Sequence, residues 1–297
     1  MKIQMSRRGL LFGAATIACG WRVALAEAAE AANSPAEKAA GHLAELEKRE
    51  GGRLGVEALD TATGRRFQHR SGERFGMCST FKFLAAAAVL QRVDQGTEQL
   101  DRRVAYGESD LLEYAPVTKE HVNEGAMTLD ALCAAAVQWS DNTAANLMLK
   151  VLGGPEIVTA FIRSTGDQVT RLDKTETELN VVRPGEVHDT TTAASMVGLL
   201  NSVVLGKALS TGSRSRLQGW MLDAKVGEHR LPAGLPTGWH IAHKTGTWSD
   251  QTNDVGVIWP TDREPIIVAA LYSRSGTRLK QREDVLRDVG RIVAAAF

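Results

Sequence analysis

The sequence predicts an α+β protein in which an antiparallel sheet, flanked by the N- and C-terminal helices, is joined to a second, all-helical domain. Apolar strand patterns lie near both ends of the chain, and a helical pattern stands beside each of them. An alanine- and leucine-rich helical pattern fills the middle, from about residue 79 to residue 220. Strands from both ends are therefore expected to share one sheet. The predicted domains are residues 27–70 with 222–297, and residues 71–221.

The elements before the helical block follow from local signals. Ser34-Pro35-Ala36-Glu37 has the residue types of a capping box, and proline fits the first turn, so a helix is expected to begin there. Gly51-Gly52 is expected to end this helix. Residues 54–59 and 67–69 are predicted strands around a turn at 60–64.

The elements after the helical block have equally clear patterns. Residues 255–259 and 266–272 are predicted strands that join through a turn at 260–265. Apolar residues then recur at helical spacing from Val285 to Val293. The segment from Trp239 to Thr247 is expected to form an edge strand, because its second half is polar.

Composition and charge exclude several classes of protein. The 297 residues are 43% hydrophobic and 24% charged, which is typical of a globular chain and not of a disordered one. Thirty-five basic residues balance 35 acidic ones, so neither nucleic acid nor an anionic membrane surface is expected as a partner. His240 and His243 are three apart on a predicted strand and should point to opposite faces. We therefore expect no metal and no cofactor.

The first 26 residues have the order of an export signal. Arg7-Arg8 precedes an apolar stretch that ends near Gly20, and Ala24-Leu25-Ala26 is a small-x-small cleavage site. The paired arginines indicate the twin-arginine route, and the stretch is too short for a comfortable membrane span. A lipoprotein modified at Cys19 is the alternative. Cleavage after Ala26 removes four basic residues and leaves 31 basic and 35 acidic residues, a net charge of −4.

The first chemical motif is Ser79-Thr80-Phe81-Lys82 before an apolar run. Serine and lysine three apart share one face of a helix. A serine hydroxyl is a weak nucleophile that needs a neighbouring base, and Lys82 can serve if burial and nearby cations lower its pKa. A capped helix with a surface lysine is the alternative.

Two further tripeptides have chemical potential. In Ser140-Asp141-Asn142 the hydroxyl could relay a proton, while the amide could orient a base or a carbonyl. Taken alone, this tripeptide is better explained by a helix start capped by Ser140 or Asp141. In Lys244-Thr245-Gly246-Thr247 the cation and hydroxyls could hold a carboxylate, and Gly246 is expected to let a ligand approach the backbone. An ordinary strand with a polar face is the alternative.

Together and in this order, the three motifs resemble the class A serine β-lactamases over about residues 34–297. The segment at about 171–189 is similar to the omega loop of that family, and Glu176 and Asn180 match its Glu-x-x-x-Asn pair, which holds the deacylating water. Tyr114 falls where the family places an aromatic wall beside the substrate. The resemblance implies an active site between the two domains.

Four positions depart from the family pattern. Thr177 follows Glu176 where proline is usual and the bond is often cis, which leaves the loop's shape open. Lys174 replaces an arginine that pairs with the aspartate matched by Asp189. Asn253 stands where many members have an arginine, and Arg230 resembles the replacement seen in a branch with carbapenem-hydrolysing members. That branch often has a disulfide from the Cys78 position, but its second cysteine is Trp248 here.

The resemblance implies a periplasmic, monomeric enzyme that hydrolyses β-lactam antibiotics through a serine acyl-enzyme. Its implied catalytic residues are Ser79, Lys82, Ser140 and Glu176, and its implied substrate-binding residues are Tyr114, Asn142, Asn180, Arg230, Lys244, Thr245, Gly246 and Thr247. The resemblance leaves open whether Lys82, Glu176 or both take the serine proton. A D-Ala-D-Ala transpeptidase or carboxypeptidase, or a non-hydrolysing β-lactam sensor, stays open as the alternative. Cys78 and Cys133 are expected to be free thiols.

Overall fold

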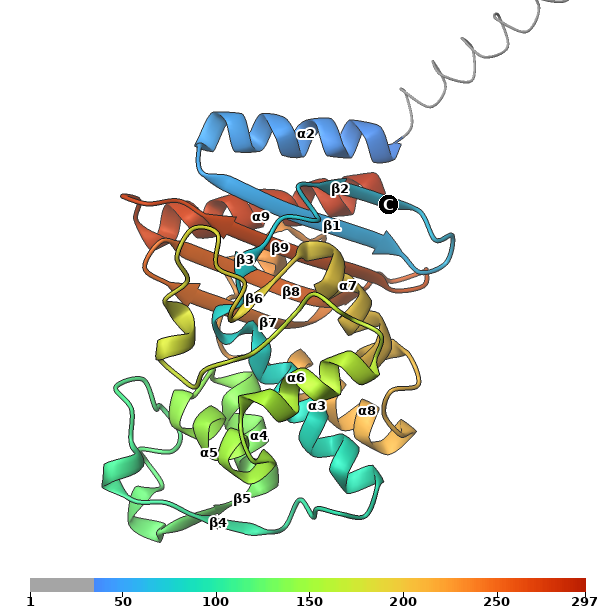
Figure 1. The fold of residues 1–297 in the computed structure, drawn as a ribbon. Coiled ribbons are helices and arrows are strands. Elements are labelled where there is room, and N and C mark those ends of the chain that lie inside the picture. Colours follow the sequence, from blue (N-terminus) through green and yellow to red (C-terminus); the bar gives the residue numbers. More distant parts are fainter. Residues whose placement is uncertain (1–34) are drawn as a thin grey trace, which may run out of the picture.

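A computed structural model describes residues 35–297, in which a five-stranded sheet packs against a block of helices (Figure 1). The export signal, Cys19 and the cap residue Ser34 lie outside the described residues. The helices are α2 (Pro35–Glu50), α3 (Phe81–Asp94), α4 (Leu129–Gln138), α5 (Asn142–Leu152), α6 (Pro155–Ser164), α7 (Ala193–Leu200), α8 (Thr211–Leu222) and α9 (Leu279–Ala296). The main sheet contains β1 (Arg53–Asp60), β2 (Arg66–His69), β7 (His240–Trp248), β8 (Gln251–Trp259) and β9 (Ile266–Ser273).

The strand order β2-β1-β9-β8-β7 confirms that strands from both chain ends share one sheet. Every neighbouring pair is antiparallel, and β1 pairs with β9 from Arg53 opposite Ser273 to Asp60 opposite Ile266. β7, which carries the Lys-Thr-Gly motif, lies at the edge as predicted. Strand β8 begins at Gln251, four residues before the predicted start, because its polar first half pairs with β7 and β9.

Alternation along each strand divides the core between the two faces of the sheet. In β9, Val268 and Ala270 pack with α2 and α9, whereas Ile267 and Ala269 join the core of the helical block. Figure 1 shows α2 and α9 together on one side of the sheet and the remaining helices on the other. The molecule therefore has the predicted α+β, two-domain layout, with the sheet buried on both faces.

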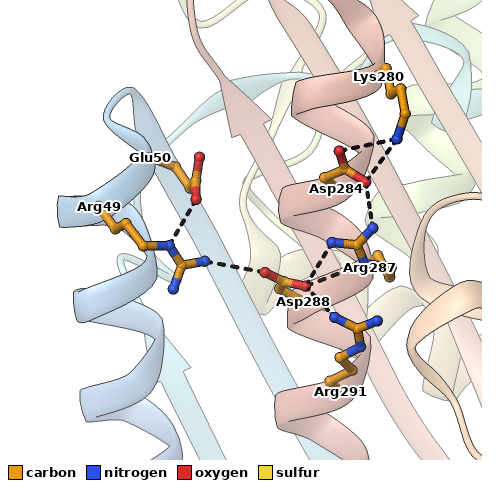
Figure 2. Close-up of polar contacts among 7 residues, drawn as sticks. All are labelled: Arg49, Glu50, Lys280, Asp284, Arg287, Asp288 and Arg291. Carbon is orange, nitrogen blue, oxygen red and sulfur yellow. Dashed lines mark hydrogen bonds and ion pairs between the residues drawn. The ribbon is translucent and has the colours of Figure 1, made fainter.

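The outer surface where α2 meets α9 is tied by ion pairs (Figure 2). Arg49 at the end of α2 donates to Asp288 of α9 at 3.1 Å. Asp288 also accepts from Arg291 at 3.0 Å, and Glu50 accepts from Arg49 at 2.8 Å. The two arginine side chains are 60% exposed and water reaches the carboxylates, so each pair contributes less than about 1 kcal/mol. Burial of the apolar faces of α2 and α9 holds them on the sheet.

Two short antiparallel strand pairs inside the helical block were not predicted. β3 (Phe75–Gly76) pairs with β6 (Thr190–Thr191), and β4 (Arg103–Ala105) pairs with β5 (Ala126–Thr128). Segments of two or three residues are too short to show a strand period. The first pair matters for function, because it ties the chain just before Ser79 to the end of the loop that carries Glu176.

Among residues 35–297, no single helix combines the length and apolar composition needed to cross a membrane. Helices α5 and α6 meet both criteria only as a pair, and a bend of 74° separates them.

A close backbone contact between α9 and the segment after Arg230 gives a stability prediction. A Cβ added to Gly290 in α9 would lie 2.5 Å from the Leu231 carbonyl oxygen, whereas a Cβ on Gly41 in α2 would meet nothing within 4 Å. Gly290→Ala is expected to destabilise the protein by about 1–3 kcal/mol through overpacking. Gly41→Ala is expected to stabilise it by about 0.5–1 kcal/mol, because alanine favours a helix interior.

Urea unfolding of the two variants measures this difference, since both make the same chemical change inside a helix. Shifts of the same sign and size would show that helix propensity alone sets the effect and that the contact around Gly290 is not tight.

Candidate active site

The predicted nucleophile lies in a 3-10 helix, Cys78–Thr80, that leads directly into α3. Cys78 has a positive φ of 46°, which is a strained conformation for a residue with a side chain. The Ser79 hydroxyl donates to Glu176 Oε1 at 3.0 Å. The turn therefore presents the serine to a carboxylate that comes from a loop almost a hundred residues later in the chain.

Lys82, the second residue of α3, is fully buried behind this serine. Its Nζ donates to the Ser140 carbonyl at 2.8 Å and to Asn142 Oδ1 at 2.6 Å, and it forms an ion pair with Glu176 Oε1 at 3.0 Å. Three acceptors match the three donors of an ammonium group. Burial lowers the pKa of Lys82, while the Glu176 carboxylate works in the opposite direction. Lys82 is thus a buried ammonium whose proton is held less tightly than that of a surface lysine.

Glu176 is held from two sides by amides. Asn180 Nδ2 donates to Glu176 Oε2 at 2.8 Å, as the predicted pairing of these two residues requires. The Asn146 amide accepts from the Glu176 N–H and donates to its carbonyl, both at 2.9 Å. Asn146 was not predicted as a site residue. Its signal was the four-residue spacing from Asn142, which places both on one face of α5.

Ser140-Asp141-Asn142 forms a capped helix start, as one of its two interpretations predicted, and its polar side chains reach the cavity and Lys82. Asp141 caps α5, accepting from the Ala144 N–H at 2.8 Å, and is fully buried. Ser140, with a φ of 59°, lines the cavity in front of the cap, and Asn142 contacts Lys82. The start of α5 therefore positions the side chains of Ser140 and Asn142.

Strand β7 places its motif residues on alternate sides. Lys244 is buried and its Nζ donates to Ser140 Oγ at 2.9 Å. Burial lowers the pKa of Lys244 well below its ordinary value, and the charges of Lys82 and Arg230 add to this effect. Thr245 and Thr247 line the cavity. The lysine therefore bridges the two domains, and the threonines face any bound ligand.

The structure gives a different reason for the glycine at position 246 from the predicted approach of a ligand. A Cβ at Gly246 would lie 2.7 Å from the Met77 carbonyl oxygen and 3.0 Å from the Cβ of Cys78. The bare side of this glycine thus faces the turn that carries Ser79, and Gly246 does not line the cavity. Glycine is needed because β7 packs against the nucleophile turn itself.

Arg230 approaches the same strand from the 3-10 helix Leu231–Gly234 and is only 4% exposed. Its Nη2 donates to Thr247 Oγ1 at 2.6 Å, and its Nη1 donates to the carbonyls of Gly246 and Asn253 at 3.2 and 2.9 Å. Its Nε donates to Glu283 Oε1 at 3.3 Å. Most N–H groups of Arg230 are therefore hydrogen-bonded within the protein. The side chain holds this part of the structure together and also lines the cavity.

These groups surround a cavity of about 390 Å³. Tyr114, 46% exposed, stands at its rim and donates to the Trp139 carbonyl at 3.2 Å. Predicted site residues that line the cavity are Ser79, Tyr114, Ser140, Asn142, Glu176, Asn180, Arg230, Thr245 and Thr247, and unpredicted ones are Val226, Gly227, Trp248, Leu279 and Glu283. Lys82, Lys244 and Gly246 lie behind this surface.

The loop that carries Glu176 is closed by main-chain donors. Asp189 Oδ1 accepts from the N–H groups of Asp173 and Lys174 at 2.8 and 3.0 Å. Asp173 Oδ2 in turn accepts from the Asp189 N–H at 3.1 Å. No ion pair joins the side chains of Lys174 and Asp189 within the described chain, and burial raises the pKa of Asp189. The Glu176–Thr177 peptide bond is cis.

The histidines and cysteines of the described residues do not gather into one site. Residues 35–297 contain no group of three or more His, Cys, Asp and Glu side chains arranged to hold a metal ion. His243 is buried and bonds Asp254 at 2.8 Å, whereas His240 is exposed. Cys78 and Cys133 are both buried free thiols, as predicted, and burial raises the pKa of each.

Comparisons with known proteins agree on one family. The family model described as "Beta-lactamase enzyme family" matches residues 38–297. Beta-lactamase L2 of Stenotrophomonas maltophilia is 45% identical over 96% of this chain and 97% of its own, and Beta-lactamase CTX-M-8 of Citrobacter amalonaticus is 44% identical over 86% and 88%.

Solved structures give the same result. The class A beta-lactamase of the last common ancestor of Gram-negative bacteria superposes with a TM-score of 0.85 at 56% identity, covering 87% of this chain and 98% of that one. A beta lactamase from Burkholderia vietnamiensis superposes with a TM-score of 0.84 at 47% identity, covering 86% and 95%.

Proposed function

Because this chain belongs to the class A β-lactamases and is a serine enzyme that hydrolyses β-lactam antibiotics and confers resistance to them, we propose that Ser79 is its nucleophile and Glu176 its principal base. The observation that carries the assignment is the 3.0 Å hydrogen bond from Ser79 Oγ to Glu176 Oε1. A carboxylate in that position can accept the hydroxyl proton as the oxygen attacks the lactam carbonyl.

Lys82 supports this base in the proposed acylation. Its three bonds to acceptors occupy all its protons, so the ammonium stabilises negative charge on Glu176 and on the attacking oxygen. The main-chain N–H groups of Ser79 and Thr247 hold the oxyanion that develops on the carbonyl, by resemblance to the family. The C–N bond of the lactam then breaks, which leaves the acyl group on Ser79 and a nitrogen that needs a proton.

Ser140 delivers that proton. Lys244 Nζ donates to Ser140 Oγ, which leaves the hydroxyl hydrogen of Ser140 free to point into the cavity. The hydroxyl gives its proton to the lactam nitrogen and takes another from Lys244. The proton that Glu176 accepted from Ser79 passes to water in the open cavity and Lys244 recovers one there, so Glu176 is again a carboxylate before deacylation. Ser140 therefore acts as the relay, and Lys244 sets its direction.

The carboxylate of the substrate is held at the opposite end of the cavity. Thr245 and Thr247 offer hydroxyls there, and Lys244 and Arg230 supply positive charge behind them. Tyr114 and Asn142 flank the ring and the acyl side chain. Charge-assisted hydrogen bonds of this kind are among the stronger polar contacts in proteins.

We assign to Glu176 the role of base in deacylation as well. Asn180 Nδ2 holds Glu176 Oε2, while Asn180 Oδ1 is buried without a hydrogen-bond partner among the described residues. One carboxylate and one amide oxygen can thus accept both hydrogens of a water molecule and aim its lone pair at the acyl carbon.

We further propose that residues 1–26 are a twin-arginine export signal and that the mature chain acts in the periplasm as a monomer. The paired arginines and the small-x-small site support export. The two-domain division at residues 27–70 with 222–297, and 71–221, is proposed for the mature chain, because the site lies where the sheet edge β7 meets α3 and the α4–α5 junction.

Hydrolysis of a chromogenic cephalosporin by the purified mature chain tests the assignment of the nucleophile. Wild-type protein is expected to turn over the substrate repeatedly, and Ser79→Ala is expected to lose this activity while retaining its fold by circular dichroism. Equal rates for the two proteins would contradict the role of Ser79.

A further inference from the structure

The wall of the cavity beside Arg230 is formed by the first turns of α9. Leu279 and Glu283 both line the cavity, and their four-residue spacing places them on one face of the helix. Leu279 is 41% exposed although its side chain is apolar. The cavity thus has an apolar side chain and a carboxylate together on the side that holds the substrate carboxylate.

One carboxylate oxygen of Glu283 accepts a hydrogen bond, and the other has no partner among the described residues. Its Oε1 accepts from Arg230 Nε at 3.3 Å, which is a long contact for a charged pair. No other hydrogen bond or ion pair of its carboxylate occurs within residues 35–297, and its side chain is 15% exposed. Arg230 meanwhile donates its Nη1 and Nη2 hydrogens to three neutral acceptors, so only its Nε contacts Glu283. The carboxylate of Glu283 is therefore only partly neutralised where it meets the cavity.

The chemistry of cephalosporins places one substituent against this wall. The ring carbon C4 carries the carboxylate, and its neighbour C3 carries a variable group. A carboxylate held at Lys244 and Thr247 brings the C3 group to the adjoining surface. A positive charge there gains from a nearby carboxylate, and the gain is larger where water is partly excluded.

We propose that Leu279 and Glu283 form a subsite for a cationic, partly apolar substituent next to the substrate carboxylate, such as a pyridinium ring on C3 of a cephalosporin. The ring packs on Leu279 while its charge faces Glu283. This inference rests on the proposed position of the substrate carboxylate, and it assigns a preferred class of substrate to this enzyme.

Cephaloridine and cephalothin form a matched pair of probes. They share the acyl side chain and the carboxylate, and they differ at C3, where the first has a pyridinium and the second a neutral acetoxy group. Glu283→Gln is expected to lower the ratio of kcat/KM for cephaloridine over cephalothin about fivefold, the size of a partly solvated charge pair. Any disturbance passed on through Arg230 affects both substrates and divides out of the ratio.

Salt gives a second readout. The wild-type ratio is expected to fall between about 50 mM and about 500 mM NaCl, because added ions screen the charge contact. In Glu283→Gln the ratio is expected to respond less. Glu283→Asp keeps the charge and is expected to retain most of the wild-type preference.

Asp284→Asn is the matched control, since it removes the same charge from the neighbouring residue. Asp284 pairs with Lys280 and Arg287 on the outer side of α9 and does not line the cavity (Figure 2). This variant is expected to keep the wild-type ratio. An unchanged ratio in Glu283→Gln, or an equal fall in Asp284→Asn, overturns the subsite. Failure of the wild type to hydrolyse either drug would instead overturn the proposed function, and the subsite with it.

Discussion

Glu176→Gln is expected to leave a penicillin covalently attached to Ser79. Glutamine cannot accept a proton from water, so deacylation loses its base, and general-base catalysis contributes roughly 10²- to 10⁴-fold. Ser79 and Lys82 remain, so acylation is expected to continue more slowly. Because the Glu176 contacts with Asn146 use its main chain, the variant keeps the anchor of the loop. Intact-protein mass spectrometry after mixing with benzylpenicillin should show a persistent adduct of one drug mass.

Two proteins serve as references for this experiment. Ser79→Ala should show no adduct under the same conditions, and the wild type should show one only briefly. An adduct that persists for hours on the wild type would favour the sensor or transpeptidase alternative. Turnover by Glu176→Gln at the wild-type rate would show that the carboxylate in contact with Ser79 is not the base.

Arg230→Ala is expected to lower both activity and stability. Loss of positive charge at the carboxylate end should reduce kcat/KM roughly 10- to 100-fold, from the strength of charge-assisted hydrogen bonds. If the side chain only faced the cavity, its loss would have little effect on folding. The structure shows Arg230 almost fully buried, with bonds to Gly246, Thr247 and Asn253. Its removal leaves these acceptors and the Glu283 carboxylate without their partner, so the free energy of unfolding should fall by about 3 kcal/mol.

Arg230→Lys separates the two effects. Lysine keeps the charge but cannot reproduce the planar fork that reaches several acceptors at once. The variant should recover part of kcat/KM and less of the stability, measured by steady-state kinetics and urea unfolding. Unchanged kcat/KM in Arg230→Ala would place the anchor elsewhere. Arg282 is a poor substitute, because it is buried and donates to Thr252 and to the Thr277 carbonyl.

The sequence by itself determined the elements whose signals lie within a few turns of chain. The period of β9, the end of α2 at Gly51 and the edge position of β7 follow from local pattern, and all three are confirmed. The same holds for Ser79 with Lys82, because a helix sets the distance between residues three apart.

Only the tertiary structure decided how separate segments meet. Glu176 lies 97 residues from Ser79, and Glu283 lies 53 residues from Arg230. The role of Gly246 came out differently from its prediction because the chain segment it faces, the turn at Met77 and Cys78, is remote in sequence. The physical reason is that contacts between elements are set by packing on the two faces of the sheet, which depends on all the core side chains at once. A local pattern identifies the groups able to do chemistry, and that packing brings them within hydrogen-bond reach.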